Sequence, residues 1–195
     1  LENFIKKIPT NIIIVIDGAY SEFIIDKNYS DGIDMVNKFP NLIVTRTFSK
    51  IFGLAGIRLG WAYSNRNIIN LLEKIRGPFN VNSIAQELGC YVLKNKNLLK
   101  KSIKHNLKWQ KKLPKMINNL GLQAFDTFTN FVLVKVNKKD SKKKIIQGLL
   151  KNGIIVRELN NYGLKEYFRV SIGTDSEIKE FLKTLEKILK KSNEI

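Results

Sequence analysis

The sequence lacks a second cysteine, a long apolar run and a cluster of metal-binding side chains. Its one cysteine, Cys90, cannot form an internal disulfide, which fits a reducing compartment, and we expect a cytoplasmic protein. The longest apolar run, residues 12–16, is far shorter than the ~20 residues of a membrane-spanning helix, so we expect no membrane segment. No grouping of His, Cys, Asp and Glu suggests a metal site.

Negative charge is scarce, because 34 Lys and Arg residues against 17 Asp and Glu residues give a net charge of +17. Such a charge can indicate nucleic-acid binding. The lysines, however, are spread over residues 94–115, 138–144 and 179–191, and aromatic side chains are not interleaved with them to form a stacking platform. We therefore expect no nucleic-acid partner, although a basic surface would favour anionic, phosphorylated substrates.

The first half of the chain has the pattern of an α/β fold. Two β-branched runs, residues 11–16 and 42–45, are typical of strands buried on both faces, and residues 31–38 between them predict a short helix. Strand, helix and strand in this order favour a parallel sheet. Further elements are expected as a strand at 58–63 and helices at 67–75 and 81–93.

The second half has an α+β pattern that follows a long helix predicted at residues 97–120 and bent near Pro114. Gly153 is expected to end one later helix, and Thr174 or Asp175 to cap the last one. Strands are predicted at 122–125, 131–136, 154–157 and 167–172, and helices at 141–152 and 175–190. Outside these patterns, we expect Cys90 to be a small buried side chain and His105 a solvated one.

Asp17 and Lys50 each follow a predicted buried strand, at the edge where open α/β sheets bind ligands. Burying either charge is costly without a partner or a function, so the two could equally form a structural ion pair. Thr47 and Ser49 add two hydroxyls, and Arg58 lies eight residues after Lys50. Together with Gly53, Gly56 and Gly60, these residues form a plausible anion cradle next to a reactive amine.

The motifs DGAY (residues 17–20) and RTFSKIFGLAGIRLGWA (residues 46–62) resemble class I and II aminotransferases of fold type I, which use pyridoxal 5'-phosphate (PLP). The second motif is similar to the histidinol-phosphate aminotransferase family in particular. So are RGPFNVN (76–82), GIIVR (153–157) and FRVSIG (168–173), and the resemblance extends over nearly all of the chain. It implies an α/β, PLP-transferase-like fold: an incomplete large domain with a parallel-rich sheet in residues 1–95, then a small α+β domain in residues 96–195.

The resemblance also implies a role for each site residue. Lys50 is the lysine that holds PLP as a Schiff base and then moves the substrate proton, and Asp17 pairs with the pyridinium nitrogen. Tyr20 donates a hydrogen bond to the phenolic oxygen of the cofactor. Substrate contacts are implied for Arg169, at the α-carboxylate, and for Arg157, at the phosphate end. The cofactor phosphate is bound by Thr47, Ser49 and Arg58.

The implied reaction transfers an amino group between histidinol phosphate, an amino-acid-like phosphorylated substrate, and 2-oxoglutarate in histidine biosynthesis, in a homodimer. An aromatic amino-acid aminotransferase, a threonine-phosphate decarboxylase and an inactive basic fragment stay open as alternatives. Gly18 stands where the family usually has Glu. The chain resembles only the latter part of family members, so we expect an N-terminally truncated fragment that is inactive alone.

Overall fold

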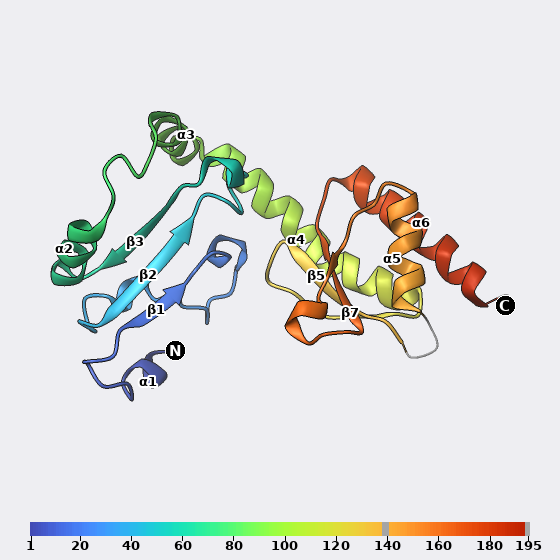
Figure 1. The fold of residues 1–195 in the computed structure, drawn as a ribbon, viewed down its shortest axis with the longest axis horizontal. Coiled ribbons are helices and arrows are strands. Elements are labelled where there is room, and N and C mark those ends of the chain that lie inside the picture. The colour runs from blue at the N-terminus through green and yellow to red at the C-terminus, as the bar shows by residue number, and fades with distance from the viewer. Residues whose placement is uncertain (138–140, 194–195) are drawn as a thin grey trace. The chain divides into compact units, whose positions relative to one another are not determined.

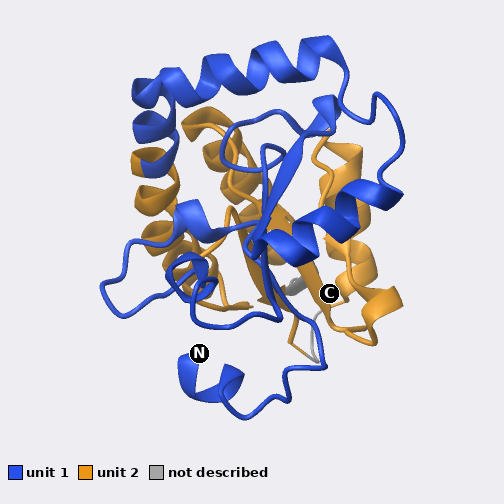
Figure 2. Cartoon of the chain, turned by 90° about the vertical axis from the view of Figure 1, so that its left-hand side faces the viewer, with its two compact units in different colours: residues 1–103 blue, residues 104–195 orange. Residues whose placement is uncertain are grey.

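The computed structural model describes residues 1–137 and 141–193, so Lys138 and Lys139 of the second lysine-rich segment lie outside the described residues. The chain forms two compact units, residues 1–103 and 104–195 (Figure 2). The division falls within α4 (Lys96–Asn119). The expected domain boundary, after residue 95, lies immediately before this helix and stays a prediction.

Unit 1 contains a three-stranded sheet in the order β1 (Ile14–Asp17), β2 (Leu42–Thr47) and β3 (Gly60–Ser64) (Figure 1). The two β-branched runs contribute the parallel pair β1 and β2, as the sequence predicts, with Asp17 beside Thr45. The first strand begins three residues later than expected, and one of its faces is exposed, so burial on both faces is wrong for β1. The third strand begins two residues later than expected and runs antiparallel to β2. This brings the carboxyl ends of β1 and β2 and the amino end of β3 to one edge of the sheet.

One face of this sheet is closed by a small apolar core. Leu42 and Val44 alternate with Ile43 along β2 and pack with Ile5, at the end of α1 (Glu2–Ile5), and with Val36. The helix expected at residues 31–38 is wrong, because only the 3₁₀ turn η2 (Ile33–Met35) forms. Gly32 adopts a left-handed φ of 84° there, and the Asp31 carboxylate accepts a hydrogen bond from the Ile33 amide, so a local turn replaces the helix start.

Two helices follow the sheet, α2 (Arg66–Ile75) and α3 (Ser83–Lys94). Asn65 and Asn82 cap their N-termini, since each side-chain oxygen accepts a backbone N–H three residues ahead. The buried stripe of α3 consists of Ala85, Gly89 and Val92. Cys90 is exposed, contrary to expectation, because it lies beside this stripe and not on it.

Unit 2 has an antiparallel sheet in the order β4 (Gln123–Ala124), β5 (Phe131–Lys135), β7 (Tyr167–Ser171) and β6 (Arg157–Glu158). The strand predicted at 154–157 is mostly wrong, because β6 shares only Arg157 with it. Gly153 takes a φ of 75° after α5 (Lys142–Lys151), and the Ile154 amide bonds back to the Leu149 carbonyl. Residues just after the helix are therefore occupied in its C-terminal cap and do not pair with the sheet.

The core of unit 2 lies between this sheet and its helices, with α5 and α6 (Asp175–Asn193) side by side (Figure 1). Leu113 and Ile117 of α4 are fully buried, and α4 continues through Pro114 as one helix. Leu185 of α6 and Phe168 of β7 fill the same core. Within the described part of the chain, the helices are all too short or too polar to cross a membrane.

Candidate functional site

The edge of the unit 1 sheet gathers the predicted anion-binding residues. Thr47 is the last residue of β2 and pairs with Gly60, the first residue of β3. The Thr47 hydroxyl oxygen accepts a hydrogen bond from the Ser49 amide at 3.0 Å, which folds the chain back immediately after the strand. Arg58 Nη1 lies 3.4 Å from Ser49 Oγ. The three side chains therefore form one cluster, although they span twelve residues of sequence.

Arg58 is held in an uncommon backbone conformation. Its φ of 60° is left-handed, a region that residues with a side chain rarely adopt. The conformation turns the guanidinium back, so that Nη1 also donates to the Ala55 carbonyl at 2.9 Å. Nε and Nη2 have no hydrogen-bond partner among the described residues, and Arg58 is exposed. A guanidinium that is anchored at one nitrogen and open at the others can bind an anion.

Lys50 and Tyr20 lie close to each other beside this cluster. Lys50 Nζ is 5.3 Å from the centre of the Tyr20 ring, and the Lys50 side chain is exposed. Asp17 ends β1, is exposed, and accepts a hydrogen bond from the Ala19 amide at 3.1 Å. Among the described residues Asp17 and Lys50 form no ion pair, and neither is buried, so the alternative of a structural ion pair is wrong.

The two predicted substrate arginines lie together in unit 2. Arg157 of β6 is the register partner of Arg169 of β7, so their side chains share one face of the sheet. The Arg169 guanidinium carbon is 4.5 Å from the centre of the Phe131 ring, whereas Arg157 is exposed. These two residues belong to unit 2, whereas Lys50 belongs to unit 1.

Sequence reasoning missed a buried charged cluster under the same sheet edge. Arg46 of β2 is almost fully buried and forms ion pairs with Asp31, at 2.7 Å, and with Glu22, at 3.8 Å. A signal was present, because Arg46 continues the i, i+2 series of Leu42 and Val44 on the core face of the strand. A charge at such a position requires a partner.

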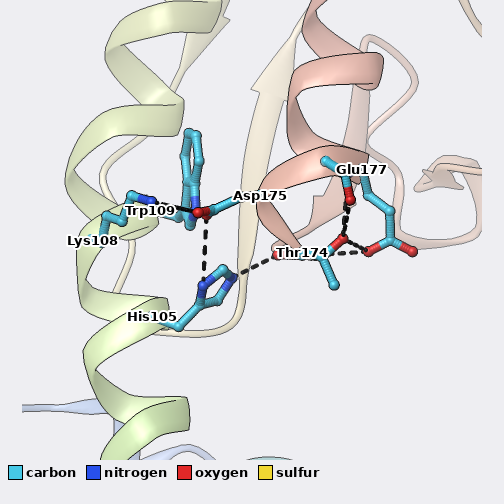
Figure 3. Close-up of polar contacts among 8 residues, drawn as sticks. His105, Lys108, Trp109, Thr174, Asp175 and Glu177 are labelled. Carbon is cyan, nitrogen blue, oxygen red and sulfur yellow. Dashed lines mark hydrogen bonds and ion pairs between the residues drawn. The ribbon is translucent and has the colours of Figure 1, made fainter.

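His105 is not the solvated side chain that the sequence predicts. It is half-buried, and its Nε2 lies 2.8 Å from the Gly173 carbonyl, just before α6 (Figure 3). Asp175 accepts hydrogen bonds from Lys108 Nζ and Trp109 Nε1, which hold the pKa of its carboxyl below the ordinary value. Thr174 and Glu177 exchange capping hydrogen bonds, so Thr174 is the N-cap of α6. These contacts fix the start of α6 on α4.

The donors at the sheet edge suit an organic phosphate that also bears a carbonyl group. Arg58 and the Ser49 hydroxyl can bind the anion, whereas the Thr47 hydroxyl donates to the Leu59 carbonyl at 3.5 Å. Lys50, which directly follows Ser49, provides an amine. In the described ranges, no group of three or more His, Cys, Asp and Glu side chains is placed to hold a metal ion.

Comparison with known proteins gives a family match over almost the whole chain. The family model described as aminotransferase class I and II matches residues 1–185. Histidinol-phosphate aminotransferase 1 of Cupriavidus pinatubonensis is 39% identical over 191 residues, which cover 97% of this chain and 51% of the relative. The chain thus spans about half the length of the curated relatives it matches.

Solved structures agree in fold. A histidinol-phosphate aminotransferase from Sinorhizobium meliloti, in complex with pyridoxal-5'-phosphate, matches with a TM-score of 0.87 at 25% identity, over 97% of this chain and 53% of that one. An L-threonine-O-3-phosphate decarboxylase from Porphyromonas gingivalis matches with a TM-score of 0.78 at 23% identity, over 93% and 56% of the two chains. The second likeness concerns the fold alone.

Proposed function

Because this chain belongs to the aminotransferase class I and II family, we propose that it provides the lysine half of a PLP-dependent aminotransferase site. The observation that supports this most is the position of Lys50, whose amine lies beside Tyr20 and next to the cluster of Thr47, Ser49 and Arg58. These residues fit the two ends of pyridoxal phosphate that the protein must hold. The phosphate requires hydroxyls and a guanidinium, and the aldehyde requires an amine.

Each residue then has a defined task. When bound, pyridoxal phosphate supplies a ring that stabilises negative charge at the α-carbon of the substrate. Lys50 Nζ would hold the cofactor aldehyde and would carry the proton to and from the substrate Cα. The Asp17 carboxylate would keep the ring nitrogen protonated, and the Tyr20 hydroxyl would donate to the phenolic oxygen. The phosphate would be bound by Arg58, Thr47 and Ser49.

We propose histidinol phosphate and 2-oxoglutarate as the substrates, in histidine biosynthesis. The relative from Cupriavidus pinatubonensis is named for the first of them, and its match covers nearly all of this chain. Arg169 would bind the α-carboxylate of the amino-acid substrate. Arg157, opposite it on the sheet, would bind the phosphate end.

The assembly and the location belong to the same proposal. We propose a homodimer in the cytoplasm, where a single exposed cysteine stays reduced. The fold is shared with a decarboxylase of phosphothreonine, so that activity is the second candidate. It differs in product, because decarboxylation releases carbon dioxide and needs no 2-oxo acid acceptor.

Borohydride trapping tests the cofactor site directly. The full-length protein is incubated with PLP and reduced with borohydride, and the modified lysine is located by peptide mass spectrometry. We expect one stable pyridoxyl group on Lys50, although the chain has many other exposed lysines. Lys50→Arg should abolish the label, and Lys74→Arg, on exposed α2, should leave it unchanged. Random labelling over the surface lysines would contradict the proposal.

Substrate choice is tested by turnover. Glutamate should form from 2-oxoglutarate with histidinol phosphate as donor, at a far higher kcat/KM than with aromatic amino acids. Release of carbon dioxide from phosphothreonine, with no need for an acceptor, would favour the decarboxylase instead.

A further inference from the structure

The buried guanidinium of Arg46 lies under the residues that we assign to the cofactor. Along β2, Arg46 shares the core face with Leu42 and Val44, and its side chain is only 3% exposed. Thr45 and Thr47 point to the opposite face. Asp17 is the register partner of Thr45, so it shares that opposite face. Arg46 therefore lies on the face of the sheet opposite to Asp17 and Thr47, and its side chain does not occupy the cofactor site.

Arg46 joins three segments at this edge. Its Nη1 donates to the Thr45 carbonyl at 2.9 Å, and the Gly18 amide donates to the same carbonyl at 3.0 Å. Its Nη2 lies 2.7 Å from Asp31 Oδ2. The Thr45 carbonyl oxygen thus accepts one hydrogen bond from Arg46 and another from the Gly18 amide. This shared acceptor sets the positions of both Gly18 and the guanidinium.

Gly18 leaves the space that the guanidinium occupies. A Cβ at residue 18 would lie 1.7 Å from Arg46 Nη1 and 2.7 Å from Ser21 Oγ. Arg46 cannot easily move away, because it is buried and paired with Asp31. Any side chain at position 18 must therefore displace the guanidinium or the backbone that leads from Asp17 to Tyr20.

Glu22 is the weaker partner of this arginine. Its Oε1 is 3.8 Å from Arg46 Nε, and its Oε2 is buried with no hydrogen-bond partner in the described residues. Burial raises the pKa of the Glu22 carboxyl, although a backbone hydrogen bond and Arg46 act in the opposite direction. Asp31 is thus the main anchor of the guanidinium, at Nη2, and Glu22 lies near its Nε.

We propose that Arg46 is a positioning residue for the cofactor site: through Gly18 and the Thr45 carbonyl it fixes the directions of Asp17 and Tyr20. This inference rests on the proposed function, because it assigns Arg46 to the same PLP site. Asp17 directly precedes Gly18 and Tyr20 follows two residues after it, so displacement of the guanidinium reorients them while Lys50 keeps its place after β2.

The test is a spectroscopic titration of the full-length protein with PLP bound. The absorbance of the lysine-bound cofactor changes with pH, and the midpoint depends on the charges and donors around the ring. We expect Gly18→Ala and Arg46→Gln each to move this midpoint by about one pH unit or more, with the borohydride label still on Lys50. Arg66→Gln, an exposed arginine at the start of α2, is the matched control and should leave the midpoint in place.

The coupling of the two residues gives an independent measurement. Arg46→Gln removes the atom that a Cβ at residue 18 would meet, so Gly18→Ala should move the midpoint, and lower the melting temperature, less in the Arg46→Gln protein than in the unsubstituted one. Additive effects, or an unmoved midpoint in both single variants, would overturn the inference while the proposed function stands. Absence of a label on Lys50 in the unsubstituted protein would overturn both.

Discussion

Arg157 on β6 lies directly opposite Arg169 on β7, and neither has an acidic partner among the described residues. Like charges that face each other across a strand pair destabilise a sheet. Arg169 is partly compensated by the face of the Phe131 ring, whereas Arg157 has no such contact with the residues that the structure describes. A pair of guanidiniums of this kind is favourable when an anion binds between or beside them, which suits a substrate that bears a carboxylate and a phosphate.

The first prediction concerns Arg157→Gln. Loss of a charge-assisted hydrogen bond to the substrate should raise KM for histidinol phosphate about 10- to 150-fold. The melting temperature of the chain should stay the same or rise, because a like-charge pair has been removed. Steady-state kinetics and thermal unfolding of the full-length protein measure the two effects, with substitution of the exposed Lys183 of α6, Lys183→Gln, as control. A lower melting temperature with unchanged KM would assign Arg157 a structural role.

The second prediction separates charge from geometry at Arg58. Arg58→Lys keeps the positive charge but loses the planar fork, so the dissociation constant of PLP should rise about 10-fold or more. Arg58→Gly relieves the left-handed backbone but removes the cation altogether, so it should stabilise the apo chain and weaken PLP further. Equilibrium titration with PLP gives the dissociation constant, and thermal unfolding of the apo-protein gives its melting temperature. Equal affinity in all three proteins would contradict the phosphate role.

The parts of the site that could be predicted from sequence are local. Four of the predicted residues lie close together in sequence at the end of β2 and in the segment that follows it: Thr47, Ser49, Lys50 and Arg58. The contacts of Ser49 with Thr47 and with Arg58 follow from that closeness. The parallel pairing of β1 and β2 was also predictable, because both are continuous β-branched runs separated by a crossover.

What could not be predicted depends on distant partners. The sequence places Arg46 on the core face of its strand, but it does not show that the partner is Asp31, fifteen residues earlier. His105 sits among lysines in the sequence, and only packing of α4 on the start of α6 gives it the Gly173 carbonyl. The turn at Gly32 depends on a left-handed φ that competes with an otherwise helical pattern.

The third prediction uses the pH dependence of unit 2. Lys108 and Trp109 hold the pKa of Asp175 below its ordinary value, so the ionised carboxylate stabilises the fold. This contribution is present above the pKa of the unfolded chain and is lost as pH falls through the lower pKa of the folded state. Asp175→Asn should therefore remove part of the stability gained between acid and neutral pH.

Trp109 provides the readout, because its Nε1 donates to Asp175 at 2.5 Å. In a Trp61→Phe background, its fluorescence should change on acidification in the parent and not in Asp175→Asn. His105 faces the same carboxylate at 3.8 Å, so His105→Gln must be measured alongside. Asp126→Asn, an exposed carboxylate in the same unit, is the control. An unchanged pH profile in Asp175→Asn would show that the contacts of Asp175 do not stabilise unit 2.

The last prediction is that this chain alone, supplied with PLP, has no measurable turnover. Its site offers one lysine and one set of phosphate donors, and the chain spans about half the length of its relatives. Among the described strands, β1 pairs on one side only, and Ile12, Ile13 and Val15 are each at least half exposed around it. An apolar strand edge of this kind favours self-association, so we expect concentration-dependent aggregates in sedimentation. Val15→Lys should reduce the aggregation without creating activity, since it protects the edge but adds no cofactor contact. A monomeric chain that transaminates histidinol phosphate would contradict the prediction.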